Sequence, residues 1–110
     1  MKMKELFDRG EFAVSAEVGP PKGIHVDELV EEAKTYLTGV HAVNVTDNQS
    51  SVMRLGSLAM CKVLKDAGMN PIFQLACRDR NRIALESDLL SAARILRVCD
   101  VFCALSQERS

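Results

Sequence analysis

Residues 41–77, HAVNVTDNQSSVMRLGSLAMCKVLKDAGMNPIFQLAC, contain the pattern that decides the fold of this chain. Short apolar runs predict strands at residues 40–46 and 71–77. Between them, apolar side chains recur every three or four positions and predict a helix over residues 52–67, with the DNQSS segment supplying N-cap candidates and Gly68 ending it. A strand, a helix and a second strand joined by short connections predict a parallel pair of strands with a right-handed crossover.

The same alternation extends in both directions along the chain. A strand at residues 12–18 and a helix at 25–37 come before this unit, and a helix at 82–96 and a strand at 101–105 follow it. The fold class is therefore predicted to be α/β, with about four parallel strands and three helices. We expect the last helix to direct its apolar stripe inward, through Ile83, Leu89, Leu90, Ala93 and Leu96.

A repeat of roughly 30 residues suits either a doubly wound open sheet or a (β/α)8 barrel. No Gly-x-Gly-x-x-Gly or Walker loop follows any strand, so the nucleotide-binding open sheet has no local support. A complete barrel needs about 250 residues. The chain has 110 residues, and we predict about half of a (β/α)8 TIM barrel, as one partial domain over residues 1–110.

Composition excludes several classes of protein. A net charge of −1 argues against nucleic acid as a partner, since phosphate binding requires a basic excess. The nearest basic cluster, Arg78, Arg80 and Arg82, is diluted by acids and is interpreted as a solvated loop and helix start. No apolar run reaches the ~18 residues that span a membrane, and the N-terminus lacks the apolar core of a secretion signal.

Four cysteines are present without the spacing of a zinc site. We interpret them as reduced thiols of a cytoplasmic protein and expect no metal centre. They are Cys61, Cys77, Cys99 and Cys103.

Polar side chains gather toward the C-terminal ends of the first three strands. Alternate residues of a strand face opposite sides, which places Ser15 with Glu17, Asn44 with Thr46, and Gln74 on one face of the sheet. These side chains either cap loops and bond each other, or they form a ligand site, because ligands bind at this end of parallel sheets. We favour a site, with Glu17 as its strongest member, since an inward carboxylate is rarely kept for packing.

The order of these motifs resembles a known family. A strand ending in Glu before a Pro-Pro turn (AEVGPP), a second strand ending NVT and a third ending QLAC resemble the N-terminal half of the methylenetetrahydrofolate reductase family, over about residues 12–96. The stretch ALESDLLSAARIL is similar to the bacterial branch. The resemblance implies a (β/α)8 barrel that holds FAD at the strand C-termini. It also implies the reduction of methylenetetrahydrofolate to methyltetrahydrofolate, with electrons from NADH or NADPH passing through the flavin.

The resemblance also implies roles for particular residues. Glu17 matches the family's general acid, which helps to open the five-membered ring of the folate. Thr46 matches a threonine near the nicotinamide and the flavin, and Asp47 and Gln49 lie in a loop that touches FAD. Gln74 matches a strand position that meets the flavin.

The sequence departs from the family pattern after residue 96. The family has a Leu-x-Gly-Asp turn after its fourth strand, whereas this chain reads ALSQERS, with Glu108 where the folate-contacting Asp would stand and Arg97 where the family usually has Gly. We therefore expect residues 97–110 to be a divergent tail of a truncated or frameshifted chain.

Two other interpretations remain open. A half-barrel could be a non-catalytic assembly module, since it leaves sheet edges unpaired. Such a module would pair with a second copy or with a complementing polypeptide. The chain could also belong to another (β/α)8 enzyme with a Glu after strand one, such as a pterin-dependent methyltransferase domain.

Overall fold

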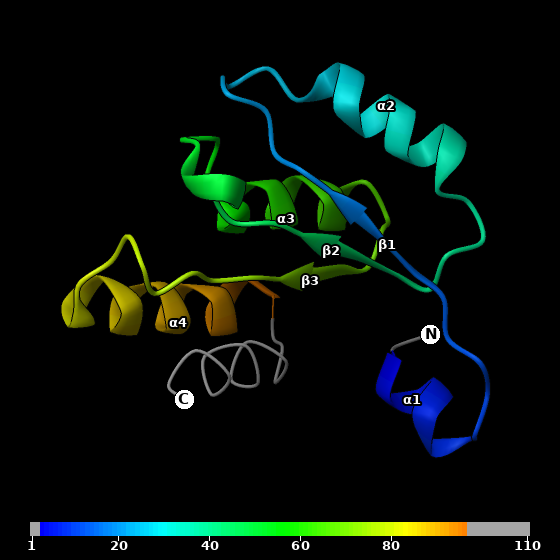
Figure 1. Ribbon diagram of the computed structural model, residues 1–110. Helices are drawn as coiled ribbons and strands as arrows, with labels where there is room; N and C mark the ends of the chain where they lie inside the picture. Colours follow the sequence, from blue (N-terminus) through cyan, green and yellow to red (C-terminus); the bar gives the residue numbers. More distant parts are fainter. Residues whose placement is uncertain (1–2, 97–110) are drawn as a thin grey trace.

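Strands and helices alternate along the chain, as predicted. The structure, a computed structural model, describes residues 3–96 (Figure 1). The elements in chain order are α1 (Met3–Asp8), β1 (Ser15–Val18), α2 (Asp27–Tyr36), β2 (Ala42–Val45), the 3-10 turn η1 (Gln49–Ser51), α3 (Ser57–Asp66), β3 (Pro71–Phe73) and α4 (Arg82–Leu96).

The strands form one parallel sheet in the order β1-β2-β3. Val45 lies opposite Val18 of β1 and Phe73 of β3, so the register places the C-terminal ends of the strands level with one another. Figure 1 shows the loops that follow all three strands at one end of the sheet, on the left of the view, with α1 at the opposite end. The predicted α/β class with parallel strands is confirmed.

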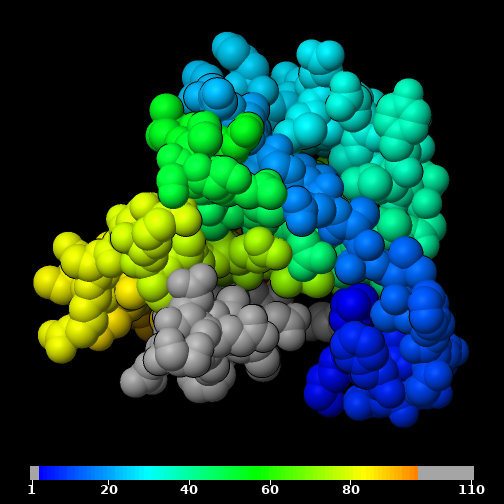
Figure 2. All heavy atoms as spheres, viewed as in Figure 1, coloured from blue at the N-terminus to red at the C-terminus, as the bar shows by residue number. Residues whose placement is uncertain are grey.

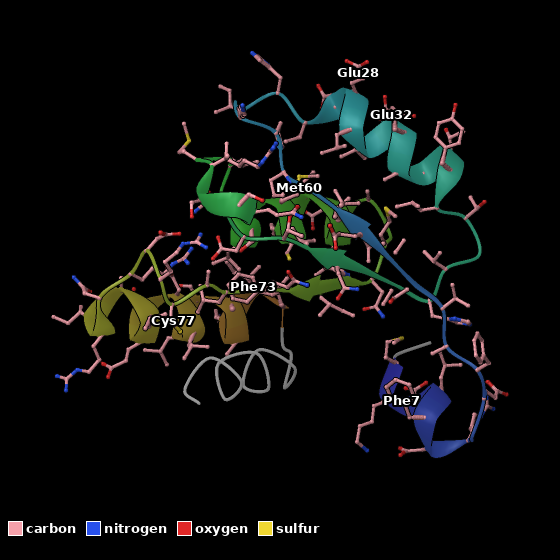
Figure 3. All side chains as sticks on the ribbon, viewed as in Figure 1. Phe7, Glu28, Glu32, Met60, Phe73 and Cys77 are labelled. Carbon is pink, nitrogen blue, oxygen red and sulfur yellow. The ribbon has the colours of Figure 1, made fainter. Side chains whose placement is uncertain are left out.

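One face of the sheet packs against helices and forms the core. Val45 is 0% exposed and Phe73 is 2% exposed, and both contact the cluster that includes Met60 and Leu64 of α3, each 0% exposed. Figure 3 labels Met60 near α3 and Phe73 near β3. The other buried members are Val18, Val30, Ala33, Val43, Cys61, Leu75, Ala92 and Leu96.

The opposite face of the sheet is not covered by these helices. Ser15 and Glu17 are exposed on it, and Asn44, Ile72 and Gln74 are half-buried. In the space-filling view of the same side, atoms of β1 and β3 are visible at the surface (Figure 2). The assignment of the two strand faces from the sequence is therefore confirmed, and the uncovered face is the one that lines the interior of a (β/α)8 barrel.

The strands are shorter than predicted. β1 begins at Ser15 rather than at residue 12, and Phe12 is 86% exposed. Val14 lies just outside the strand, where its N–H donates to Nδ1 of His41 (2.9 Å) and its carbonyl accepts the His41 N–H (2.7 Å). β2 spans 42–45 instead of 40–46. β3 ends at Phe73 rather than Cys77, because β2 has already ended at Val45 and the ladder has no further partner there.

Helix α3 begins five residues later than predicted. It starts at Ser57 with Gly56 as its N-cap, and no side chain caps it. The DNQSS segment does not cap the helix, because the Asn48 side-chain oxygen accepts the N–H of Arg54 (2.9 Å) inside a tight loop. Residues 49–51 of this loop form η1. The helix predicted over 25–37 is observed as α2, one or two residues shorter at each end.

The bounds predicted for α4 are confirmed. Of the predicted inward stripe, Leu89 and Leu96 pack on the core, whereas the prediction is wrong for the exposed residues Ile83, Leu90 and Ala93. Ile83 is 73% exposed and Leu90 is 75% exposed, whereas Ala92 is fully buried. The side that packs on the core carries Leu85, Leu89, Ala92 and Leu96, spaced four, three and four residues apart. The predicted stripe covered too wide an arc, because α4 has apolar residues on more than one side and packing against α3 selects only one of them.

The short helix α1 was not predicted. It buries Leu6, which is 3% exposed, while Phe7 on its other side is 63% exposed (Figure 3). The predicted strand at 101–105 and the tail at 97–110 lie outside the described residues.

Candidate functional site

The C-terminal ends of the three strands bring the predicted site residues to one edge of the uncovered face. Glu17 pairs in register with Asn44, and Asn44 pairs with Ile72. Thr46 follows β2 directly and Gln74 follows β3 directly, so each lies one residue beyond its strand at this edge. The structure thus places polar groups from three separate segments of the chain at the open end of the sheet.

Glu17 is held by the backbone of β1, and its side chain is exposed. Within residues 3–96 its carboxylate has no hydrogen-bond or ion-pair partner. Together with Gly19 and the α2 residues Glu32 and Tyr36, it lines a hollow of about 230 Å³ along the outer edge of β1. The carboxylate is therefore free to contact a ligand.

The remaining polar residues of this face divide into paired and unpaired groups. The side-chain amide of Asn44 donates to Ser15 Oγ and to the carbonyl of Ala16, at 3.4 Å each. For Asn44, the structure therefore supports the alternative in which the polar residues of this face bond each other rather than a ligand. Thr46 is only 6% exposed, yet its hydroxyl has no partner among the described residues, and the same holds for the half-buried side-chain amide of Gln74.

Asp47 is engaged in a buried ion pair rather than facing open space. Its side chain is 2% exposed, and its carboxylate accepts the N–H of Ala76 (2.7 Å) and two guanidinium contacts from Arg80. Arg80 also bonds Asp88 (2.8 Å) and the carbonyl of Ala76 (2.7 Å). The hydrogen bond to Asp47, with smaller contributions from the charges of Asp47 and Asp88, raises the pKa of Arg80 above its usual value.

This ion pair corrects one interpretation made from the sequence. Arg80 is not a solvated residue, because its side chain is only 16% exposed. The solvated interpretation is confirmed for Arg82, whose side chain is 87% exposed. A basic residue after one strand and an acidic residue after its parallel neighbour were the available signal for the pair, because such residues meet at one edge of the sheet.

The loop after β2 has an unusual backbone. Asn48, Ser50 and Ser51 all have positive φ angles, of 45°, 59° and 61°. Residues other than Gly adopt this region at a cost of roughly 1–2 kcal/mol each. Gln49 lies in this loop with an exposed side chain, and Glu108 lies outside the described residues. The strained loop is held by the Asn48 side chain, which accepts the main-chain N–H of Arg54, and by the guanidinium of Arg78, which donates to the Asn48 carbonyl. Sequence reasoning missed Arg54 because loops carry no periodic pattern.

Three further properties concern the part of the chain that the structure describes. Residues 3–96 contain no group of three or more His, Cys, Asp or Glu side chains arranged to hold a metal ion. Over the same residues, no helix combines the length and the apolar character needed to cross a membrane. Neither Cys61 nor Cys77 forms a disulfide within the described residues; Cys77 is half-buried, and burial raises the pKa of Cys61 to about 12.

Comparison with known families decides where this chain belongs. The family described as "Methylenetetrahydrofolate reductase" matches residues 2–96. The chain belongs to the methylenetetrahydrofolate reductase family. No curated protein and no solved structure gave a match.

Membership confirms the resemblance seen in the AEVGPP, NVT and QLAC motifs. It also fits the observed sheet, because the three parallel strands and their helices are consecutive units of the (β/α)8 barrel that this family adopts. The family consists of oxidoreductases of one-carbon metabolism.

Proposed function

We propose that this chain carries the proton-donating and flavin-contacting part of a methylenetetrahydrofolate reductase. The reaction is the FAD-dependent reduction of methylenetetrahydrofolate to methyltetrahydrofolate, with electrons from NADH or NADPH. The observation that supports it most is the placement of Glu17 at the C-terminal end of β1, with no partner for its carboxylate among residues 3–96, at the same edge of the sheet as Thr46 and Gln74. Family membership supplies the reaction class.

The residues present fit a flavin. A buried hydroxyl without a partner costs about 1–3 kcal/mol, so Thr46 gains from a ligand that accepts its hydrogen bond. The Gln74 amide can both donate and accept, which suits the carbonyls and ring nitrogens of a flavin. We assign Thr46 and Gln74 to hold the ring system, and the loop with Asp47 and Gln49 to border it. When bound, FAD would supply hydride transfer.

Glu17 is assigned as the general acid. A carboxyl group with no internal partner can hold a proton and deliver it to the folate ring nitrogen that leaves the methylene bridge. Asn44 lies beside Glu17 in the sheet and is tied to Ser15, so it keeps its amide away from the carboxylate. The buried pair of Asp47 and Arg80 meanwhile fixes the loop that follows Thr46.

The test compares Glu17→Gln with Glu28→Gln. Glu28 lies on the outer side of α2 and points away from the sheet, so it is a matched control (Figure 3). We expect Glu17→Gln to leave FAD binding and reduction of the flavin by NAD(P)H intact, and to lower folate reduction by roughly 10²–10⁴-fold. Unchanged folate turnover in Glu17→Gln would exclude the general-acid role, and a colourless protein that does not quench flavin fluorescence would exclude the cofactor site.

A second function is supported by a separate observation. Within residues 3–96, β1 and β3 each pair on one side only, and α4 exposes Ile83 and Leu90. Unpaired edges and exposed apolar residues favour a half-barrel that assembles with a second copy or with a complementing polypeptide. Sedimentation equilibrium tests this function, because a strict monomer at every concentration, with no copurifying polypeptide, contradicts it.

A further inference from the structure

We propose that Arg54 is a positioning residue for Glu17. It ties the turn that follows β1 (residues 19–21, the Gly-Pro-Pro turn) to the loop that follows β2, and so fixes the end of the strand that carries the acid. This inference rests on the proposed role of Glu17, and it concerns a residue to which the proposed function assigns no role.

In the Gly-Pro-Pro turn, the backbone of the two prolines can form hydrogen bonds only through its carbonyl groups. Pro20 and Pro21 have no N–H, so neither can donate a hydrogen bond. The carbonyl of Pro20 accepts Nη1 of Arg54 at 3.2 Å, and the carbonyl of Pro21 accepts the main-chain N–H of Leu55 at 2.7 Å. Two consecutive residues of one loop therefore supply both bonds to the two prolines.

Arg54 is itself anchored on the other side. Its main-chain N–H donates to Oδ1 of Asn48 at 2.9 Å, and its side chain is half-buried. Within the described residues its guanidinium forms no ion pair with a carboxylate, in contrast to Arg80. A charged donor makes a hydrogen bond about twice as strong as a neutral one, so the bond to Pro20 is the stronger kind of tie.

Glu17 is paired with Asn44 in the sheet, and beyond that pairing it depends on this tie to fix the end of its strand. Its carboxylate has no partner in residues 3–96, and β1 pairs with β2 alone. Beyond Glu17, the chain is held by the Thr46 N–H, which donates to the carbonyl of Val18 (3.2 Å), and then by the bonds to the turn. Loss of the Arg54 side chain removes the charged bond only three residues after the acid.

Two other arginines at this end of the sheet, Arg78 and Arg80, bond a different pair of loops. Arg78 donates to the carbonyl of Asn48 (3.1 Å) and Arg80 bonds Asp47, so both join the loop after β3 to the loop after β2. Arg54 is the described arginine that joins the loop after β2 to the loop after β1. Figure 1 shows these two loops beside each other beyond the ends of their strands.

The experiment uses Arg54→Gln, the conservative Arg54→Lys, and Arg94→Gln as a matched control, because Arg94 is an exposed arginine of α4 whose side chain forms no hydrogen bond or ion pair with the described residues. Small misplacements of a catalytic group lower rates strongly, so we expect Arg54→Gln to lower kcat about 10-fold and to leave KM and FAD affinity within about twofold. Arg54→Lys recovers part of the rate, and Arg94→Gln behaves as the wild type. In a Glu17→Gln background, Arg54→Gln causes no further loss.

A second readout does not depend on turnover. Amide chemical shifts of Glu17 and Gly19 should move, and hydrogen exchange of the Leu55 amide should accelerate, in Arg54→Gln but not in Arg94→Gln. Unchanged shifts and exchange in Arg54→Gln would refute the tie, and these spectra decide the question if the wild-type chain shows no turnover. If Arg54→Gln does not fold, the same shifts and exchange rates are measured in Arg54→Lys, and unchanged values there refute the tie. An unchanged kcat in Arg54→Gln, or an equal loss in the Glu17→Gln background, would refute action through Glu17. Full turnover in Glu17→Gln alone would instead refute the proposed function and leave the spectra to decide the tie.

Discussion

Substitution of Asp47 by Asn removes the negative charge from a buried ion pair and keeps a side chain of nearly the same size and shape. The Asn side chain keeps an oxygen for the Ala76 N–H, which lies 2.7 Å from the carboxylate, but it removes the negative charge opposite Arg80. Arg80 then stays in a site where its side chain is 16% exposed, with part of its charge uncompensated. We expect a lower free energy of unfolding.

The magnitude follows from the partners that Arg80 retains. Loss of one member of a fully buried pair costs about 3–5 kcal/mol. Arg80 still contacts Asp88, whose side chain is 37% exposed, and the carbonyl of Ala76. The loss in Asp47→Asn should therefore be about 1–3 kcal/mol, and larger in Asp47→Ala, which also leaves the buried Ala76 N–H without its acceptor.

The assay is urea unfolding followed by circular dichroism. Asp66→Asn is the control, because Asp66 forms an ion pair with Lys62 at the surface, and such pairs contribute little. A double-mutant cycle of Asp47→Asn with Arg80→Gln should give a coupling energy of about 1–3 kcal/mol. If Asp47→Asn and Asp66→Asn are equally stable, the reasoning about this ion pair is wrong.

Two further predictions concern the core. Burial raises the pKa of Cys61 from 9.0 to about 12, so above pH 9 the unfolded chain loses a proton that the folded chain keeps, and stability falls as pH rises. At pH 10 the loss should be about 1 kcal/mol relative to Cys61→Ala in parallel urea titrations, and identical pH profiles would contradict it. Leu64→Ala should cost about 2–5 kcal/mol in the same assay, because Leu64 is 0% exposed. Leu90→Ala should cost far less, because Leu90 is 75% exposed, and equal losses would place the core elsewhere.

The faces of the strands could be predicted from the sequence because the period of a strand is fixed at two residues. This is why Glu17 and Gln74 were assigned to the open face, and why Val45 was assigned to the core. The inward face of α4 could not be predicted in the same way. Ile83 and Leu90 are apolar like Leu89, and only the docking of α4 on α3 distinguishes them.

The loops of the site were beyond sequence reasoning for a different reason. The tie made by Arg54 depends on where one long side chain reaches across space, whereas the strand ends carried a signal for the pair of Asp47 and Arg80. In the loop after β2, Asn48, Ser50 and Ser51 have left-handed backbone conformations. These residue types often cap helices, but here they form a tight loop instead. The residue types of this segment predicted N-caps, but α3 begins later, at Ser57, and no side chain caps it.

The position of β2 between β1 and β3 has a consequence for synthesis of the chain. β1 leaves the ribosome before β2, its neighbour in the described sheet, because Ser15 pairs with Ala42, which is synthesised later. β2 in turn gains its second neighbour only when residues 71–73 emerge, after α3. During that interval Val43 and Val45, which are 1% and 0% exposed in the folded chain, are not yet buried by the segments that follow them. A nascent chain therefore passes through a stage with unpaired strand edges and exposed apolar side chains, both of which favour aggregation.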